Sequence, residues 1–250
     1  NVWCAAGKGT FGTVELINRI DRTGLPTKVA HRTLVVPQLG APGIAPHEVK
    51  KATGFKVRYG PIRAEDLPDF LDRGMEATPA MRRARFNLRD RLVLIPVELV
   101  QAWKPSLMVC LLILLVSALT VPDLSFASLL SAGLPPTVLY LVALVAGSVV
   151  TPILLPWIPG RAFSLKGAQV GLLLAILAAV VMGSMWRATD VVALVLTAPA
   201  VAAYFALTFT GSTTFTSLSG VEKEMRIALP LIVLVVVVGA VAWTIGRLLA

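Results

Sequence analysis

Charged residues are scarce in this chain of 250 residues, and they are scarcest in its second half. Only 15% of the residues are charged, whereas 56% are hydrophobic, and the mean hydropathy is +0.78. Residues 1–104 hold 17 of the 23 Lys and Arg and 10 of the 14 Asp and Glu, which leaves 6 basic and 4 acidic residues for 105–250. This composition excludes a protein that is soluble throughout. It predicts a basic soluble domain over 1–104 and a membrane domain over 105–250.

No charged residue interrupts five apolar runs in the second half. Each run is long enough for a helix to cross a hydrocarbon core of about 30 Å. The runs cover about 105–121, 138–158, 168–186, 191–209 and 227–246. We therefore predict an all-α transmembrane domain of five helices. Ionisable residues inside a membrane mark transport pathways, and since these runs have none, an anchoring and docking role is favoured over transport.

Basic residues are distributed unevenly between the two ends of this predicted bundle. With five crossings, the Arg-rich segment 81–104, the loop with Arg161 and Lys166, and the loop with Lys223 and Arg226 fall on one side. Loops rich in Lys and Arg stay in the cytoplasm. We expect a multi-pass protein of the inner (cytoplasmic) membrane, with the soluble domain in the cytoplasm and the C-terminus outside.

No charged segment followed by an apolar core opens the sequence, so we expect no signal peptide in this stretch. The sequence begins at Asn1 and enters directly into a motif. We expect further residues to precede it, so that the soluble domain is incomplete at its N-terminus.

Segments with strand and helix patterns alternate in the soluble domain. The predicted strands are 28–37 and 55–59, and the predicted helices are 13–20, 45–52 and 64–72. This alternation is typical of an α/β Rossmann-like domain, which binds ligands at the carboxyl ends of its strands. The short run 92–100, which contains Pro96 and Glu98, is expected to be a final strand or a membrane-proximal segment.

An acidic residue is absent where a dinucleotide site requires one. The segment from Gly7 to Gly12 satisfies G-x-G-x-x-G, but residues 27–32 offer no carboxylate for a ribose hydroxyl. Lys8 is followed by Gly9 and not by Ser or Thr, which excludes a Walker A loop. The glycines are better explained by close approach of the backbone to a large flat ligand.

Cysteine is nearly absent, with two residues in the chain. Cys110 lies in an apolar run, where a thiol behaves as a small hydrophobe. Cys4 is therefore the candidate for thiolate chemistry. We expect it on a short glycine-flanked turn, close to Lys8 and to the start of the helix 13–20, where a thiol pKa is lowered.

The segment Asn1-Val2-Trp3-Cys4-Ala5-Ala6-Gly7-Lys8 resembles the cap-helix motif of the HgcA family, the membrane-anchored corrinoid proteins of microbial mercury methylation. This family is related to the large subunit of the corrinoid iron–sulfur protein of the acetyl-CoA pathway. Segments 157–167 and 209–220 and the five predicted helices are similar to the family as well. Val14 departs from it, because an acidic residue is frequent at that position.

The resemblance implies that a corrinoid is bound by Asn1, Val2, Trp3, Cys4, Ala5, Ala6, Gly7, Lys8, Gly9 and Thr10. It makes the Cys4 thiolate the lower axial ligand of the corrinoid cobalt. Histidine typically holds cobalamin through Asp-x-His-x-x-Gly, and neither His31 nor His47 lies in that pattern. Both are interpreted as structural or surface residues.

The resemblance also implies a corrinoid-dependent methyltransferase that converts inorganic mercury(II) to methylmercury. Its methyl supply would be of the methyltetrahydrofolate type, and its electron donor a ferredoxin-like protein with two four-iron four-sulfur clusters. Mercury(II) is an electrophile, and a soft thiolate donor favours delivery of methyl with carbanion or radical character. Two alternatives stay open: a corrinoid methyl carrier of one-carbon or acetyl-CoA metabolism, and a membrane transporter or sensor with a nucleotide-binding domain.

A basic face just before the first apolar run has two interpretations. It could hold anionic headgroups of the lipid membrane or meet an acidic redox partner. Nucleic acid is disfavoured as a partner because this charge adjoins the membrane. The face comprises Arg82, Arg83, Arg85, Arg89 and Arg91.

Overall fold

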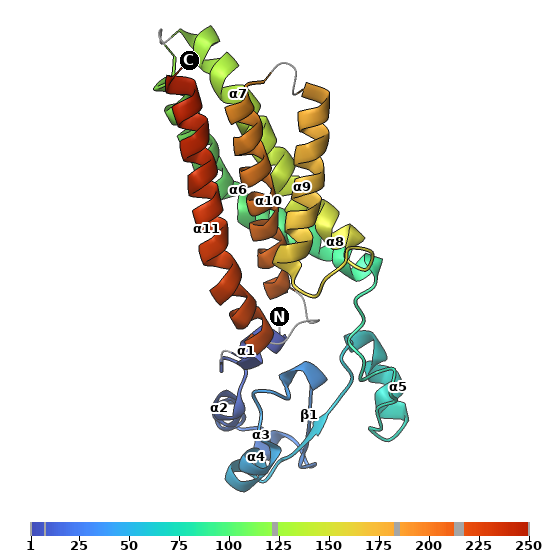
Figure 1. Ribbon diagram of the computed structural model, residues 1–250. Helices are drawn as coiled ribbons and strands as arrows, with labels where there is room; N and C mark the ends of the chain where they lie inside the picture. The colour runs from blue at the N-terminus through green and yellow to red at the C-terminus, as the bar shows by residue number, and fades with distance from the viewer. Residues whose placement is uncertain (1, 8, 122–124, 183–185, 213–217, 250) are drawn as a thin grey trace. The chain divides into compact units, whose positions relative to one another are not determined.

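The computed structural model describes residues 2–7, 9–121, 125–182, 186–212 and 218–249, with the backbone alone for Trp3, Cys4, Met182, Ser212 and Leu218. The chain divides into two compact units, Asn1–Arg85 and Phe86–Ala250 (Figure 1). Each unit has its own hydrophobic clusters, so the two are treated separately.

The first unit is built around two short parallel strands, β1 (Thr33–Val36) and β2 (Lys56–Tyr59). They pair from Thr33 opposite Lys56 to Val36 opposite Tyr59. A parallel pair requires a crossover connection, which α4 supplies. The remaining elements are α1 (Val2–Gly7), α2 (Thr13–Thr23), α3 (Leu25–Lys28), η1 (Gln38–Gly40), α4 (Pro46–Thr53), η2 (Ala64–Asp66) and α5 (Leu67–Asp72).

Local sequence explains where the main helices of this unit begin and end. In α2, Arg19 pairs with Glu15 one turn earlier at 2.6 Å, and the helix stops at Gly24, whose φ of 58° favours glycine. In α4, Pro46 lies in the first turn, where a proline suits a helix. The core joins Ile20, Val36, Ile44, Val49, Phe55 and Val57.

The predicted alternation of strands and helices is therefore present, with shifted bounds. The helices expected at 13–20 and 45–52 correspond to α2 and α4, and the strand expected at 55–59 to β2. The strand expected at 28–37 is shorter, because α3 takes up its first residue and Pro37 ends it. The described residues form a two-stranded sheet, so the larger Rossmann-like layer stays a prediction.

The second unit holds five helices that are long and apolar enough to cross a membrane, with mean hydropathies of 1.9 to 2.6. This confirms the predicted five-helix transmembrane part by length and composition. The helices are α6 (Leu88–Ala118), α7 (Phe126–Val145), which continues through the π-helical η3 (Ala146–Val150) into α8 (Thr151–Leu154), α9 (Phe163–Met182), α10 (Ala188–Ser212) and α11 (Leu218–Leu248).

Two of these helices begin well before the apolar runs that predicted them. The start of α6 is fixed by a capping box, in which Asn87 and Asp90 bond each other's backbone N–H groups. The segment 92–100 is consequently the second and third turns of a membrane helix, and the expectation of a strand there is wrong. Similarly, α7 begins after Ser125, whose hydroxyl accepts from the Ser128 N–H at 3.2 Å.

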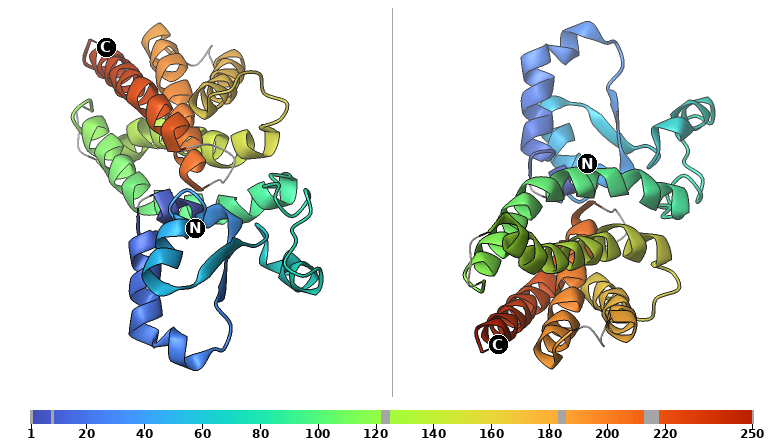
Figure 2. Two further views of the ribbon diagram at one scale, coloured as in Figure 1. Left: turned by 90° about the horizontal axis from the view of Figure 1, so that it is seen from below. Right: turned by 90° about the horizontal axis from the view of Figure 1, so that it is seen from above.

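Helix α10 is the centre of the bundle. Seen along the helices, α10 lies between α9 and α11 (Figure 2), and it packs on both and on α7. Small residues permit this approach: a Cβ added to Gly171 would lie 2.7 Å from the Ala198 carbonyl oxygen, and one added to Gly167 would lie 2.5 Å from that of Ala202. Among the five candidate spans α10 is the most buried and α11 the least.

Charged residues do lie within these helices, contrary to the expectation from the apolar runs. Arg91 and Glu98 of α6 are both buried. The Arg91 Nη1 donates to the carbonyl oxygens of Pro152 at 2.7 Å and Ile153 at 2.8 Å, at the end of α8. Arg91 is therefore not part of an exposed basic face. Its guanidinium is buried and donates to carbonyls that have no partner within α8. Arg82, Arg83, Arg85 and Arg89 are exposed.

Candidate functional site at the edge of the two-stranded sheet

The segment with the predicted corrinoid ligand is helical rather than a turn. Cys4 lies in the first turn of α1, a helix separate from α2, and the lowered thiol pKa expected for it stays a prediction. The turn follows at Gly9, whose φ is 77°. Of the ten predicted contact residues, Asn1 and Lys8 lie outside the described residues, as do the side chains of Trp3 and Cys4.

The glycine segment after α1 folds back onto that helix. The Gly9 N–H donates to the Ala6 carbonyl at 3.2 Å, and the Phe11 N–H donates to the Ala5 carbonyl at 3.0 Å. The Thr10 hydroxyl donates to the same Ala5 oxygen at 3.2 Å. These bonds satisfy the carbonyls at the end of α1 and leave Gly7, Gly9 and Thr10 exposed side by side.

A loop that follows β1 holds this motif in place. The Gly43 carbonyl accepts from the Thr13 N–H at 3.0 Å, and the Thr13 hydroxyl in turn accepts from the Ala45 N–H at 2.8 Å. A Cβ added to Gly43 would lie 2.7 Å from the Phe11 oxygen and 2.8 Å from the Ala6 oxygen. Only glycine therefore allows the loop to lie directly against the backbone of the motif.

This loop lies at the carboxyl edge of the sheet. β1 ends at Val36 and β2 at its partner Tyr59. The Tyr59 hydroxyl donates to the Ile44 carbonyl in the loop at 2.8 Å, and burial raises its pKa, which keeps the phenol a donor. The motif and the carboxyl ends of both strands are thus brought together, where parallel sheets bind ligands.

Other candidate residues lie elsewhere. His31 is exposed just before the amino end of β1, and the His47 side chain is 82% exposed. Cys110 is free and half-buried within α6. In the described part of the chain, no group of three or more His, Cys, Asp or Glu is arranged to hold a metal ion.

The polar segment 157–167 contacts α11 through Glu224, four residues beyond the segment 209–220. The Glu224 carboxylate of α11 accepts from the backbone N–H and the hydroxyl of Ser164, both at 2.7 Å. The Lys166 Nζ donates to the Leu155 carbonyl at 2.6 Å. Part of the segment 209–220 falls outside the described residues.

The contribution of the loop after β1 was not predicted from the sequence. The sequence nevertheless indicates this loop. The run Pro37-Gln38-Leu39-Gly40-Ala41-Pro42-Gly43 is rich in glycine and proline, which predicts a loop. It directly follows a strand, and loops at the carboxyl ends of parallel strands line ligand sites. Gln38 carries a buried Oε1 without a hydrogen-bond partner among the described residues.

Comparison of the chain with family models, curated proteins and solved structures finds no match.

Proposed function

We propose that this chain is a corrinoid-dependent methyltransferase that transfers a methyl group to inorganic mercury(II), with the Cys4 thiolate as the lower axial ligand of the corrinoid cobalt. The observation that carries the proposal is the eight-residue segment 1–8. Its support is the position of the motif backbone beside the carboxyl edge of β1 and β2. The two strands would belong to a larger Rossmann-like sheet.

The described residues of the motif suit a broad, flat cofactor. Gly7, Gly9 and Thr10 form an exposed surface with little side-chain bulk, and a Cβ added to Gly9 would meet nothing within 4 Å. Beneath it, Ala6 is buried against the loop after β1. A rigid backbone of small residues permits close approach of a ring without costly rearrangement.

A bound corrinoid would supply the cobalt that carries the methyl group. Cys4 would donate electron density to that metal, which a thiolate does more strongly than a hydroxyl or an imidazole. Strong donation suits an electrophilic acceptor such as mercury(II), which takes the methyl group together with bonding electrons. The loop around Gly43 would hold the motif backbone in a fixed position for the cofactor.

The second unit supports a membrane location for this activity. We propose the inner membrane, with the first unit in the cytoplasm and the C-terminus outside, where a ferredoxin-like electron donor with two four-iron four-sulfur clusters and a methyltetrahydrofolate-type supply can reach it. The exposed Arg82, Arg83 and Arg85 of the first unit, and separately Arg89 of the second, offer cations to anionic lipid or to an acidic partner.

The absorption spectrum of the purified protein, expressed with any sequence that precedes Asn1 in its gene, tests the proposal. A corrinoid spectrum that changes its axial-ligand bands in Cys4→Ala supports it. A flavin spectrum or a featureless one refutes it and favours the transporter or sensor alternative. A corrinoid spectrum without methylmercury formation favours the methyl carrier of one-carbon metabolism.

A further inference from the structure

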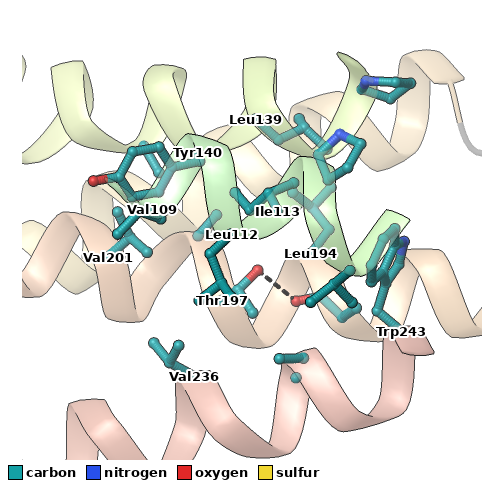
Figure 3. A pocket seen from close by; sticks show the side chains of 18 of the residues that line it. Val109, Leu112, Ile113, Leu139, Tyr140, Leu194, Thr197, Val201, Val236 and Trp243 are labelled. Atoms are coloured by element: carbon teal, nitrogen blue, oxygen red, sulfur yellow. Dashed lines mark hydrogen bonds between the residues drawn. The ribbon is translucent and has the colours of Figure 1, made fainter. Parts of the chain in front are cut away.

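An apolar cavity of about 520 Å³ lies inside the second unit, between α6, α7, α10 and α11. Figure 3 shows side chains from all four helices facing this space, among them Leu112, Tyr140, Thr197 and Val236. The proposed methyl transfer uses none of them. Leu112 is 58% exposed, so the cavity opens on the lipid-facing surface of the bundle.

The cavity is elongated along the bundle. In the described part of the chain α11 packs against α10 and makes little contact with α6 or α7, which leaves a groove with α10 as its floor. Its lining along α10 extends from Asp190 to Phe205. At 1.5 Å per residue this is about 22 Å, longer than the half-thickness of about 15 Å of a hydrocarbon core. A long, flexible apolar chain fits this shape better than a compact ligand does.

One end of the groove is charged and aromatic. It is lined by Trp186, Asp190, Trp243 and Arg247, where α10 begins and α11 ends. The Arg247 guanidinium carbon lies 5.8 Å from the centre of the Trp243 ring. Tryptophan is enriched at the level of lipid headgroups, so this end belongs at the membrane–water interface.

One nitrogen of the Arg247 guanidinium, Nε, is buried and lacks a hydrogen-bond partner among the described residues. It lies 3.5 Å from the Asp190 Oδ1, an ion-pair distance too long for a good N–H···O bond. Arg187 adds a second cation nearby through its Nη1 bond to the Gly246 carbonyl. Two arginines against one aspartate leave this end positive.

At the opposite end of the groove, the Tyr140 hydroxyl already has a hydrogen-bond partner, because it donates to the Ser106 hydroxyl at 3.0 Å. The ligand therefore has an apolar body and a single anionic head. We infer that the groove binds one anionic phospholipid, with an acyl chain along α10 and its phosphate at Arg247. The phosphate supplies acceptors and a counter-charge for the Arg247 guanidinium, whose side chain is 30% exposed, and the chain lies against a wall of Val, Leu and Ile side chains.

Lipid retention by the full chain tests this inference. The protein is reconstituted in vesicles of equimolar phosphatidylglycerol and phosphatidylcholine, extracted in detergent, and its retained lipids are counted by mass spectrometry. Wild type should retain phosphatidylglycerol in preference to phosphatidylcholine. Arg247→Gln should reduce that preference about tenfold, because charge-assisted hydrogen bonds are lost. Arg247→Lys should keep part of it.

A second variant tests the groove independently of the charge. Ala240 lines the cavity, so Ala240→Phe should displace the acyl chain and lower retention of phosphatidylglycerol. Val241→Phe is the matched control, because Val241 is 50% exposed and does not line the cavity. Melting temperatures of all variants show that the bundle is folded.

Three outcomes would overturn the inference. These are equal retention of both lipids by wild type, unchanged retention in Ala240→Phe, and release of the lipid by inorganic phosphate alone. None of them bears on corrinoid binding, so this inference and the proposed function fail separately.

Discussion

Replacing Gly43 with alanine should loosen the motif that carries Cys4. The added Cβ would lie 2.7 Å from the Phe11 oxygen and 2.8 Å from the Ala6 oxygen, and both are backbone atoms that cannot turn aside as a side chain can. Such crowding costs about 1–3 kcal/mol. Alanine restricts the unfolded chain and offsets about 0.4–1 kcal/mol of this. With central values of about 2 and about 0.7 kcal/mol, the net loss is about 1.3 kcal/mol, which corresponds to about tenfold more frequent local opening.

Hydrogen exchange of the full chain in detergent, read by mass spectrometry, measures this opening. Peptides that contain the Phe11 and Thr13 amides should exchange faster, since these N–H groups bond to Ala5 and Gly43. Gly54→Ala is the control, because its φ of 78° strains alanine while nothing crowds the Cβ. Its effect should centre on the end of α4. Unchanged protection at Phe11 and Thr13 in Gly43→Ala would refute the reasoning.

Three further predictions address the chemistry, the orientation and the bundle. Cys4→Ala and Cys4→Ser should insert in the membrane but form no methylmercury, and near-normal formation by the alanine variant would exclude an axial thiolate. A reporter after Ala250 should behave as extracytoplasmic and one near Ser217 as cytoplasmic, with the reverse pattern contradicting the positive-inside argument. Arg91→Gln should lower the melting temperature strongly, because it weakens the hydrogen bonds to the Pro152 and Ile153 carbonyls at the end of α8. Each bond lost should cost about 1–3 kcal/mol. Arg89→Gln, at an exposed position, should have little effect, and equal shifts would contradict the role of Arg91.

The membrane helices were predictable because each carries an uninterrupted apolar run, yet their starts were not. The apolar pattern identifies the part of a helix that lies in lipid, whereas a helix begins where its first N–H groups find acceptors. For α6 that point is the capping box at Asn87, eighteen residues before Pro105. Pro96 and Pro105 are both accommodated inside this helix.

The candidate site was predictable only in part. The strand and helix pattern brings the segment after β1 to a carboxyl edge, and the glycines of the motif indicate a tight backbone. The contact between the motif and Gly43 joins residues about thirty positions apart. No local pattern specifies such a long-range contact, because it depends on how α1 packs against η1.

The central position of α10 has a consequence for how the protein is made. Chains emerge from the ribosome N-terminus first, and α10 is the fourth of the five candidate spans. Helix α9 is therefore synthesised before its principal packing surface exists, whereas α6 packs mainly on α7, which is already made. Each of the first three spans must be stable in lipid before α10 is made. Their mean hydropathies of 1.9 to 2.2 favour such insertion. Completion of the bundle then waits on the small residues of α10, so a ribosome stalled before residue 188 should leave α6 paired with α7 and α9 without its main partner.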